Sequence, residues 1–511
     1  MHRPLLPRLL PVAALLGLAL LAFGCGGGRV RFVLLHTNDL HGQMLAREVR
    51  RGETGARARV GGFASIAAYV RTARQESAAD GAEVLLVDAG DWYQGTPEGN
   101  RTQGTAVVEW MNLVGYDAAT LGNHELDHGI ENTFRLLGLA KFPVLAANVF
   151  DRKTGARPAG LRPRAVLRRR GIALAFVGLL SHRTPELTSA PIGEALRFED
   201  ETAVVREAVD EARREADHVF LLTHCGIDVD RALAALVPMV PAIVGGHSHT
   251  RLLEPVKVGQ TLVVQTGAKG EAIGRVEFEA EEGTKALRIT DARLVDLLPE
   301  ATGEDPASAA IVRREEAAVR AEMEEQIGEL LADLGRGSGP GSSPAGNLTT
   351  DAMREASAAD IAFTNKGGVR AALLAGPVTR RSFFEMLPFD NTVVVLEMTG
   401  AEVAEALRAS LSKEARTPLE VSGLEARWRP AGDGKAEFLG ATFGGAPLDP
   451  GRTYRVAVNS FLAGGGDGYA SFTRPKVRRD TGILVRDAAV EWFRKRTPFR
   501  PKPEDRLRSK P

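Results

Sequence analysis

Histidine and aspartate residues gather in a few short segments of this chain. Seven of the ten histidines lie in four segments, at residues 34–42, 120–129, 221–226 and 244–250. Asp39 and His41 stand two positions apart after an apolar run, so both side chains can leave the same side of the chain and hold one ion. His247 and His249 repeat this spacing. A lone histidine at a strand end is usually structural, but the joint pattern predicts a metal centre.

Three further candidate ligands follow other apolar runs. Asp91 comes directly after Gly90, which permits a tight turn that presents the carboxylate. Asn123 follows a third apolar stretch, and His224 closes a fourth. These positions extend the predicted metal centre to seven candidate ligands from five segments.

The ligand types indicate two catalytic metal ions. Carboxylate, imidazole and amide ligands without thiolate suit Mn, Zn, Fe or Co, and a shared carboxylate suits two ions about 3.5–4 Å apart. The two cysteines, Cys25 and Cys225, have neither the number nor the spacing of a thiolate site or a disulfide framework. Two cations lower the pKa of a water molecule between them and neutralise the oxygens of a phosphoryl group under attack. We therefore expect a two-metal hydrolase.

A catalytic pair adjoins these candidate ligands. His124 directly follows Asn123, and Asp127 lies three residues later. A histidine can give a proton to a leaving oxygen, and a carboxylate can fix its orientation. The spacing predicts that Asp127 orients His124.

Short apolar strands must position these residues. From Arg29 onward, apolar runs alternate with amphipathic stretches, which is typical of an α/β fold. Runs that are apolar throughout indicate sheets covered on both faces, where ligands gather beyond the strand ends. The runs lie at residues 30–36, 82–90, 142–149, 172–180, 217–224, 241–247 and 261–267.

Length and composition indicate several globular domains. The chain has 511 residues, of which 44% are hydrophobic and 25% charged. The formal net charge is zero, which argues against a polymeric nucleic acid partner. We expect the first domain at 29–300. Residues 301–346 would form one long helix from Gly303 to Leu334 and a flexible Gly/Ser/Pro linker, before a second domain at 347–499 and a solvated basic tail at 500–511.

The first 25 residues have the pattern of a secretory signal. A basic start precedes the apolar run from Leu9 to Phe23, which is short for a membrane span. The segment before Cys25 is similar to a bacterial lipobox, although Ala22 and Phe23 depart from its usual residues. We expect an exported protein of the periplasm or cell envelope, anchored by lipid on Cys25. The alternative is export without lipidation.

Five motifs together resemble the calcineurin-like metallophosphoesterase superfamily, namely NDLH, GD, GNHE, TH and GHSH. Two longer segments resemble its 5′-nucleotidase / UDP-sugar hydrolase family, namely LHTNDLHG and GNHELDHG. The resemblance covers most of residues 29–297. It implies a four-layer α/β/β/α sandwich, joined by the long helix to a separate C-terminal α/β substrate-binding domain. His124 and Asp127 match the catalytic pair of the family.

The resemblance also implies how the ligands divide between the metals. Asp91 would bridge the two ions. His249 stands where the family often has glutamine, and remains a competent ligand. One metal would take Asp39, His41, Asp91 and His249, and the other would take Asp91, Asn123, His224 and His247.

The second half resembles the C-terminal substrate-binding domain of the same family, over about residues 346–490. Asn365 and Arg370 correspond to residues that face the substrate. An arginine after a glycine-rich turn also suits a phosphate clamp, because its planar fork meets two oxygens at once. Phe461 and Asp467 match the base-stacking aromatic and the ribose-binding carboxylate.

Two departures from the family concern the substrate. The family often has another phosphate-binding arginine where this chain has residues 341–344, which contain none. The second aromatic wall of the base clamp is expected where Pro418 or Leu419 stands. Hydrolysis is therefore better supported than recognition of a base.

The resemblance favours a 5′-nucleotidase that releases phosphate from nucleoside monophosphates by attack of hydroxide held between two metals. Other esters stay open, namely UDP-sugars, 2′,3′-cyclic nucleotides, or a sulfur substrate as in the related thiosulfohydrolases. A solute-binding lipoprotein without turnover is the alternative of another class. A broken ligand or catalytic position would favour it, and the sequence contains none.

Overall fold

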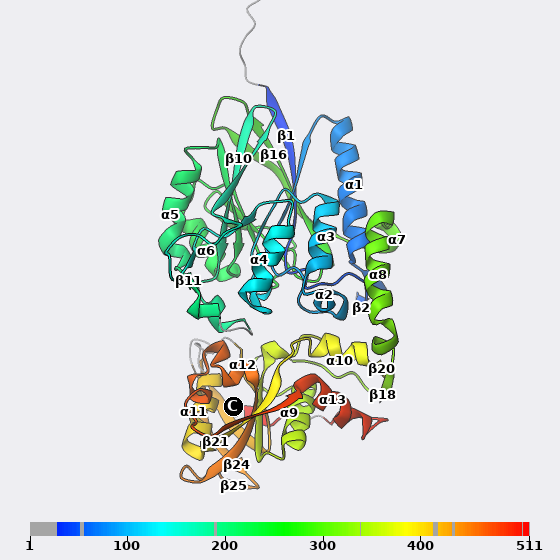
Figure 1. Ribbon diagram of the computed structural model, residues 1–511, viewed down its shortest axis with the longest axis vertical. Helices are drawn as coiled ribbons and strands as arrows, with labels where there is room; N and C mark the ends of the chain where they lie inside the picture. The colour runs from blue at the N-terminus through cyan, green and yellow to red at the C-terminus, as the bar shows by residue number, and fades with distance from the viewer. Residues whose placement is uncertain are drawn as a thin grey trace, which may run out of the picture.

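The computed structural model describes residues 28–51, 56–188, 192–337, 339–411, 417–431, 435–502 and 504–509. Two α/β domains lie one above the other, with the N-terminal domain at the top of Figure 1. The predicted signal segment and Cys25 lie outside the described residues. No helix in the described ranges is long and apolar enough to cross a membrane.

Two sheets form the centre of the N-terminal domain. The first has the order β17 (Leu287–Asp296), β16 (Ala272–Glu281), β1 (Arg29–Thr37), β4 (Glu83–Asp88), β5 (Ala118–Thr120), β6 (Val144–Leu145) and β8 (Leu161–Arg162). The second has the order β14 (Val256–Val258), β15 (Thr261–Val264), β13 (Ala242–Gly245), β12 (His218–His224), β10 (Ile172–Leu180) and β9 (Arg164–Arg169). All seven apolar runs contribute to these strands or to the loops that leave them.

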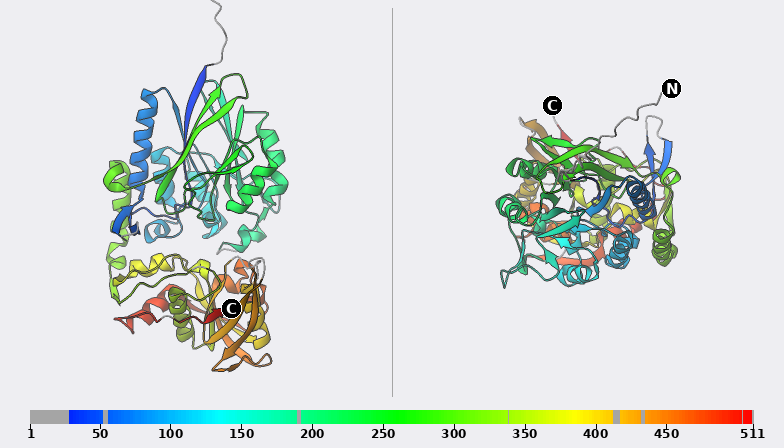
Figure 2. Two further views of the ribbon diagram at one scale, coloured as in Figure 1. Left: turned by 180° about the vertical axis from the view of Figure 1, so that it is seen from behind. Right: turned by 90° about the horizontal axis from the view of Figure 1, so that it is seen from above.

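Apolar residues bury both faces of each sheet. Phe220 of the second sheet packs against Phe278 of the first, and Phe176 stacks on Phe220 in the same core. The outer face of the first sheet packs on α1 (Phe63–Ala79) and α3 (Thr105–Val114), near α4 (Gly129–Leu139). The second packs on α5 (Glu201–Ala212) and α6 (Ile227–Leu236). The views from front and back show helices outside both sheets (Figures 1 and 2). The predicted four-layer α/β/β/α sandwich is confirmed.

Smaller elements complete this domain. Two short antiparallel strand pairs lie outside the large sheets, β2 (Arg47–Arg51) with β3 (Ala56–Val60) and β7 (Val149–Asp151) with β11 (Leu196–Phe198). The short helix α2 (Pro97–Arg101) lies at the interface with the second domain. The short helix α7 (Pro299–Thr302) comes just before the segment that joins the domains.

The helix that joins the domains is shorter than predicted. It is α8 (Pro306–Met323), which begins with Asp305 as N-cap and packs along α1. The prediction of one helix from Gly303 to Leu334 was wrong. Residues Gln326–Leu330 form β18, which pairs with β20 (Gly376–Thr379). Burial of Ile327 and Leu330 in the second core outweighs local helix propensity.

The C-terminal domain contains a mixed sheet and a smaller one. The five-stranded sheet has the order β22 (Leu419–Ser422), β19 (Ile361–Asn365), β26 (Thr453–Asn459), β21 (Thr392–Thr399) and β27 (Arg478–Leu484). The four-stranded sheet has the order β25 (Ala446–Pro447), β24 (Lys435–Phe443), β23 (Leu424–Ala431) and β28 (Leu507–Ser509). The helices are α9 (Pro344–Ser357), α10 (Arg380–Met386), α11 (Gly400–Ser410), α12 (Ser460–Ala463) and α13 (Val485–Arg494).

Two predicted flexible segments are structured. Helix α9 begins inside the expected linker, because Ser343 accepts a hydrogen bond from the Gly346 amide and Pro344 takes the first helical position. The expected solvated tail contains β28, which pairs in parallel with β23. Arg506 bonds both carboxylate oxygens of Asp351, and Leu507 is buried. Long-range pairing therefore orders chain whose composition is typical of loops.

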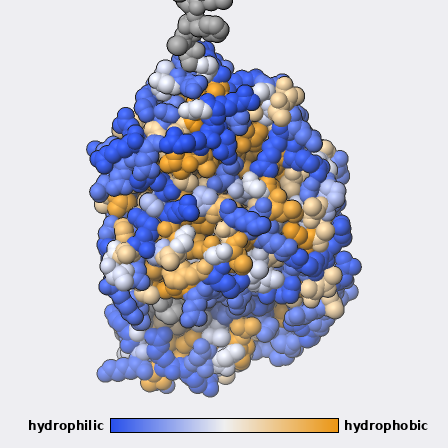
Figure 3. Space-filling model, turned by 45° about the horizontal axis from the view of Figure 1, so that its top comes forward, coloured by the Kyte–Doolittle hydropathy of each residue, from blue (hydrophilic) through white to orange (hydrophobic). Residues whose placement is uncertain are grey.

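On the face of Figure 3, hydrophilic residues surround smaller hydrophobic groups. Where the two domains meet, Arg381 of α10 forms an ion pair with the buried Glu98 of α2. Gln94 and Asn100 donate hydrogen bonds to the Pro388 carbonyl across the same interface. These polar contacts hold the two domains face to face.

Candidate active site between the domains

The carboxyl ends of strands from both sheets converge on one site. Strands β1, β4 and β5 of the first sheet and β12 and β13 of the second end at the side that faces the C-terminal domain. The loops that follow these strands carry the seven predicted ligands. Six of them fall into overlapping groups, and within each group the ligand atoms lie within 4.8 Å of one another. The seventh, Asn123, forms a hydrogen bond with His247. The structure therefore brings all seven residues together.

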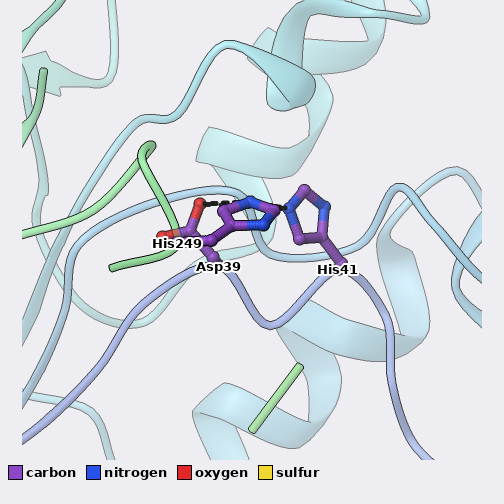
Figure 4. A group of neighbouring side chains, drawn as sticks. All are labelled: Asp39, His41 and His249. Atoms are coloured by element: carbon purple, nitrogen blue, oxygen red, sulfur yellow. Dashed lines mark hydrogen bonds and ion pairs between the residues drawn. The ribbon is translucent and has the colours of Figure 1, made fainter. Parts of the chain in front are cut away.

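One group contains Asp39, His41 and His249 (Figure 4). His249 Nε2 lies 3.3 Å from Asp39 Oδ1 and 2.9 Å from His41 Nε2. His41 donates its Nδ1 proton to the Gln94 carbonyl at 2.8 Å, which leaves Nε2 to face the group. Three ligand atoms thus converge from two loops.

A second group contains Asp91, His224 and His247. His224 Nε2 lies 3.1 Å from Asp91 Oδ2, while its Nδ1 donates to the Ala89 carbonyl at 2.6 Å. His247 Nδ1 lies 2.9 Å from Asn123 Oδ1. Asp91 Oδ2 also lies 3.8 Å from His41 Nε2, so its carboxylate stands between the two groups.

The backbone of this site adopts a rare conformation at several ligands. The φ angles lie between 49° and 76°, in the left-handed region that costs non-glycine residues of order 1–3 kcal/mol each. The residues are Asp39, His41, Asp91, His247 and His249. The surrounding hydrogen bonds maintain this geometry, for example from the His41 amide to the Asp91 carbonyl at 2.9 Å. Such strain is concentrated at functional sites.

The donor set and its charge fit divalent cations. Burial disfavours the charged imidazole of His224, but the carboxylates of Asp91 and Asp39 outweigh it and raise its pKa to about 10. The pKa of Asp91 is held well below its usual range despite burial, because His224, His124 and His41 face it. The carboxylates of Asp39 and Asp91 therefore stabilise positive charge between the candidate ligands. Two carboxylates, four imidazoles and an amide oxygen are ligands that Mn, Zn, Co and Fe accept.

His124 lies beside this centre and is oriented by Asp127. Its Nδ1 donates to Asp127 Oδ2 at 2.6 Å, and its amide donates to Asp91 Oδ1 at 2.9 Å. Thr188 holds the other Asp127 oxygen at 3.1 Å. Burial lowers the pKa of His124, but Asp127 and Asp91 outweigh it and the pKa is raised. The Nε2 atom lies 3.9 Å from Asp91 Oδ2, so it can hold a proton next to the candidate metal ligands.

Two buried residues that sequence reasoning missed hold the ligand loops. Glu125 accepts hydrogen bonds from the amides of Gly122, Asp91 and Trp92, at 2.6 to 3.0 Å. Asn38 donates to Asp39 Oδ2 at 2.8 Å. Both lie inside recognised motifs, but amide contacts made across the fold have no signal in local spacing.

The C-terminal domain contributes residues to the same site. Arg370 Nη2 lies 3.3 Å from His41 Nε2 and 3.4 Å from His249 Nε2. A cavity between the domains is lined from the upper side by Asn123, His124, Leu187 and His247, and from the lower side by Asn365, Gly367, Gly368, Arg370, Phe389, Asn391, Thr417, Phe461 and Asp467. All four predicted substrate residues line this cavity.

Asp467 and Asn365 are joined at the floor of the cavity. Asn365 Nδ2 donates to Asp467 Oδ2 at 2.7 Å, and the Thr417 hydroxyl donates to the same oxygen. Neither Pro418 nor Leu419, which were considered for the second wall of the base clamp, is among the residues that line the cavity. Leu419 begins β22 and is buried in the domain core, so Thr417 lines the cavity there.

Two more basic residues lie near Arg370. Arg336 donates a hydrogen bond to the Arg370 carbonyl at 3.4 Å, five residues before the stretch that lacks an arginine. Burial, with repulsion from Arg47, Arg370 and Arg336, lowers the pKa of Lys269 to about 7. Sequence reasoning missed both residues, because each lies in a glycine-containing loop without a motif. Arg336, and Lys269 in its charged form, add positive potential beside the cavity, which favours an anionic substrate.

Family models match both halves of the chain. A calcineurin-like phosphoesterase model matches residues 32–251, and a 5′-nucleotidase C-terminal domain model matches residues 326–474. The protein UshA of Escherichia coli is 28% identical over 522 residues, which cover 92% of each chain.

Solved structures resemble the whole two-domain arrangement. A 5′-nucleotidase precursor from Thermus thermophilus has a TM-score of 0.86 and 30% identity, over 94% of this chain and all of that one. The sulfate thiohydrolase SoxB of Thermus thermophilus has a TM-score of 0.79 at 22% identity, over 94% of this chain and 96% of that one, which shows the shared fold alone. The chain is a phosphoester hydrolase that belongs to the 5′-nucleotidase family of the calcineurin-like metallophosphoesterases.

Proposed function

We propose that this protein is a two-metal 5′-nucleotidase that releases phosphate from nucleoside monophosphates. The proposal rests on one cavity that both domains line. In it, His124 and candidate metal ligands of one domain face Arg370 and Phe461 of the other. A phosphoryl group beside the metals would leave its organic part next to the C-terminal residues. The relatives named 5′-nucleotidase support this substrate class.

Seven residues would hold two cations, chosen from Mn, Zn, Co or Fe. One set is Asp39, His41, Asp91 and His249, and the other is Asp91, Asn123, His224 and His247. When bound, the cations supply the charge that acidifies a water molecule and neutralises phosphoryl oxygens. The contact of Asp91 with both groups supports its bridging role.

The other residues would bind the ester and move a proton. Arg370 would hold phosphoryl oxygens with its planar guanidinium. His124 Nε2 would donate its proton to the leaving ribose oxygen, while Asp127 keeps the imidazole oriented through Nδ1. Phe461 would stack on the base, and Asp467, held by a hydrogen bond from Asn365, would accept a hydrogen bond from a ribose hydroxyl.

A substrate panel with defined metals tests the proposal. The chain from Gly26 onward is stripped of metal, reloaded with Mn, Co, Zn or Fe, and assayed for phosphate release from AMP and an aryl phosphate. UDP-glucose and a 2′,3′-cyclic nucleotide complete the panel. We expect chelation to abolish turnover and AMP to be hydrolysed far faster than the aryl phosphate. Equal turnover of AMP and the aryl phosphate would contradict the nucleotide assignment.

A different phosphate ester is the second candidate. Phe461 lines the cavity, but Thr417, which lines it next to Pro418 and Leu419, has no ring to stack on a base, so a base would be held less firmly. UDP-glucose or cyclic nucleotide turnover above that of AMP would favour this candidate. Absence of turnover with every metal would favour the solute-binding alternative.

We also propose export with a lipid anchor on Cys25, on the pattern of the first 25 residues. In cells that process bacterial lipoproteins, the wild-type chain should fractionate with membranes, and Cys25→Ala should move it to the soluble exported fraction. The same distribution for both chains would contradict lipidation.

A further inference from the structure

The loop between α10 and β21 crosses from the C-terminal domain to the catalytic loops of the other domain. The Pro388 carbonyl accepts hydrogen bonds from Gln94 Nε2 at 3.3 Å and Asn100 Nδ2 at 3.4 Å. Gln94 also accepts the Nδ1 proton of His41 through its own carbonyl. Pro388 thus anchors the loop to Gln94, whose carbonyl in turn holds the candidate metal ligand His41.

Phe389, the next residue, packs on the imidazole of His124. The two ring centroids lie 5.4 Å apart, and the ring planes differ by 27°. The Arg370 guanidinium carbon lies 5.8 Å from the centroid of the same phenyl ring. Phe389 is half-buried and lines the cavity. One side chain therefore touches the proposed proton donor of one domain and the proposed phosphate clamp of the other.

The two hydrogen bonds of His124 do not fix the tilt of its imidazole ring, against which the His41 ring also packs with centroids 5.4 Å apart and planes at 62°. The hydrogen bond from Nδ1 to Asp127 sets one edge of the imidazole, and the His124 amide is tied to Asp91. Neither contact opposes tilting of the ring about the Nδ1 bond, which would displace Nε2. A flat phenyl ring against the imidazole face opposes this tilt and excludes water from that face. Displacements of about 1 Å at a reacting group can cost 10²-fold in rate.

We propose that Phe389 is a positioning residue for proton transfer, which seats the His124 imidazole when the C-terminal domain lies against the catalytic loops. The inference rests on the proposed role of His124 as proton donor to the leaving group. Phe389 itself exchanges no proton. It acts through the orientation and shielding of His124, and it joins domain contact to the proton-transfer step.

The leaving group distinguishes this role from a purely structural one. A nucleoside oxygen is a poor leaving group that needs a proton, whereas p-nitrophenolate is weakly basic and leaves without one. For Phe389→Leu we expect kcat for AMP to fall about tenfold or more, with kcat for p-nitrophenyl phosphate within about twofold of wild type. Phe389→Tyr retains the ring and should restore AMP turnover. Metal content and the midpoint of thermal unfolding establish that each variant is folded and loaded.

Phe461→Leu is the matched control, because Phe461 is the other aromatic residue of the cavity and has no ring contact with His124 among the described residues. Its expected effect is a higher KM for AMP, without the selective loss of kcat. A double-mutant cycle completes the test: in a His124→Ala background, Phe389→Leu should change kcat for AMP by less than about twofold.

Two results would overturn the inference. Equal losses for AMP and p-nitrophenyl phosphate would show that Phe389 acts through Arg370 or domain contact alone. Additive effects of Phe389→Leu and His124→Ala would separate the two residues. Failure of the proposed function is seen independently, as a wild-type enzyme inactive toward AMP. The same cycle is then run with whichever alkyl phosphate the wild-type enzyme hydrolyses.

Discussion

His124→Ala is expected to lower kcat for AMP by about 10²–10⁴, the usual contribution of a positioned general acid. The imidazole is held by Asp127 at 2.6 Å, and Nε2 lies 3.9 Å from Asp91 Oδ2, the carboxylate proposed to bridge the two metals. Without it, the ribose oxygen must leave unprotonated or take a proton from water. Steady-state kinetics with the metal-loaded variant measure the effect on kcat and KM separately.

The loss should depend on the leaving group and not on metal binding. The variant should retain the metal content of the wild-type enzyme, and p-nitrophenyl phosphate turnover should fall much less than AMP turnover. Asp127→Asn is the milder companion, because it keeps the shape of the orienting group and removes its charge. A near-normal AMP rate in fully loaded His124→Ala would exclude His124 from proton transfer.

Asp91→Asn is expected to have the other large effect, a loss of kcat of about 10³ or more together with loss of metal. Asp91 Oδ2 lies within 3.9 Å of nitrogen atoms of His41, His124 and His224. Removal of one charge from a shared ligand weakens both proposed ion sites, and each ion contributes several kcal/mol to stabilisation of the transition state. Metal content after dialysis, measured by mass spectrometry, and kcat at saturating metal give the two readouts.

Asparagine preserves the size of the side chain and an oxygen that can accept the His124 amide proton. The loops should therefore remain folded, which circular dichroism can establish. Asp127→Asn serves again as the matched control, since Asp127 lies outside the proposed ligand set and its variant should bind two metals. If Asp91→Asn retains both metals and most of its activity, the bridging assignment is wrong.

The sequence by itself predicted the strands from its apolar runs, the sandwich from its family resemblance, and the residues of the candidate metal centre from their spacing. Apolar runs too short for helices predicted strands buried on both faces, and each of these strands exists. Pairs such as Asp39 and His41 follow strand ends, where parallel strands of one layer deliver their loops to a common edge. Local spacing was sufficient here, because each ligand lies within a few residues of the strand that positions it.

The tertiary structure alone decided how the two domains share one site. Nothing in local spacing places Arg370 within 3.4 Å of His41 and His249, or Phe389 against His124. Glu125 likewise has a role that depends on amides from two loops, one of them far away in the chain. Composition predicted a linker and a free tail where α9 begins and β28 pairs with β23. Propensity describes a segment in isolation, whereas burial and strand pairing with residues far along the chain outweigh it when the domains form.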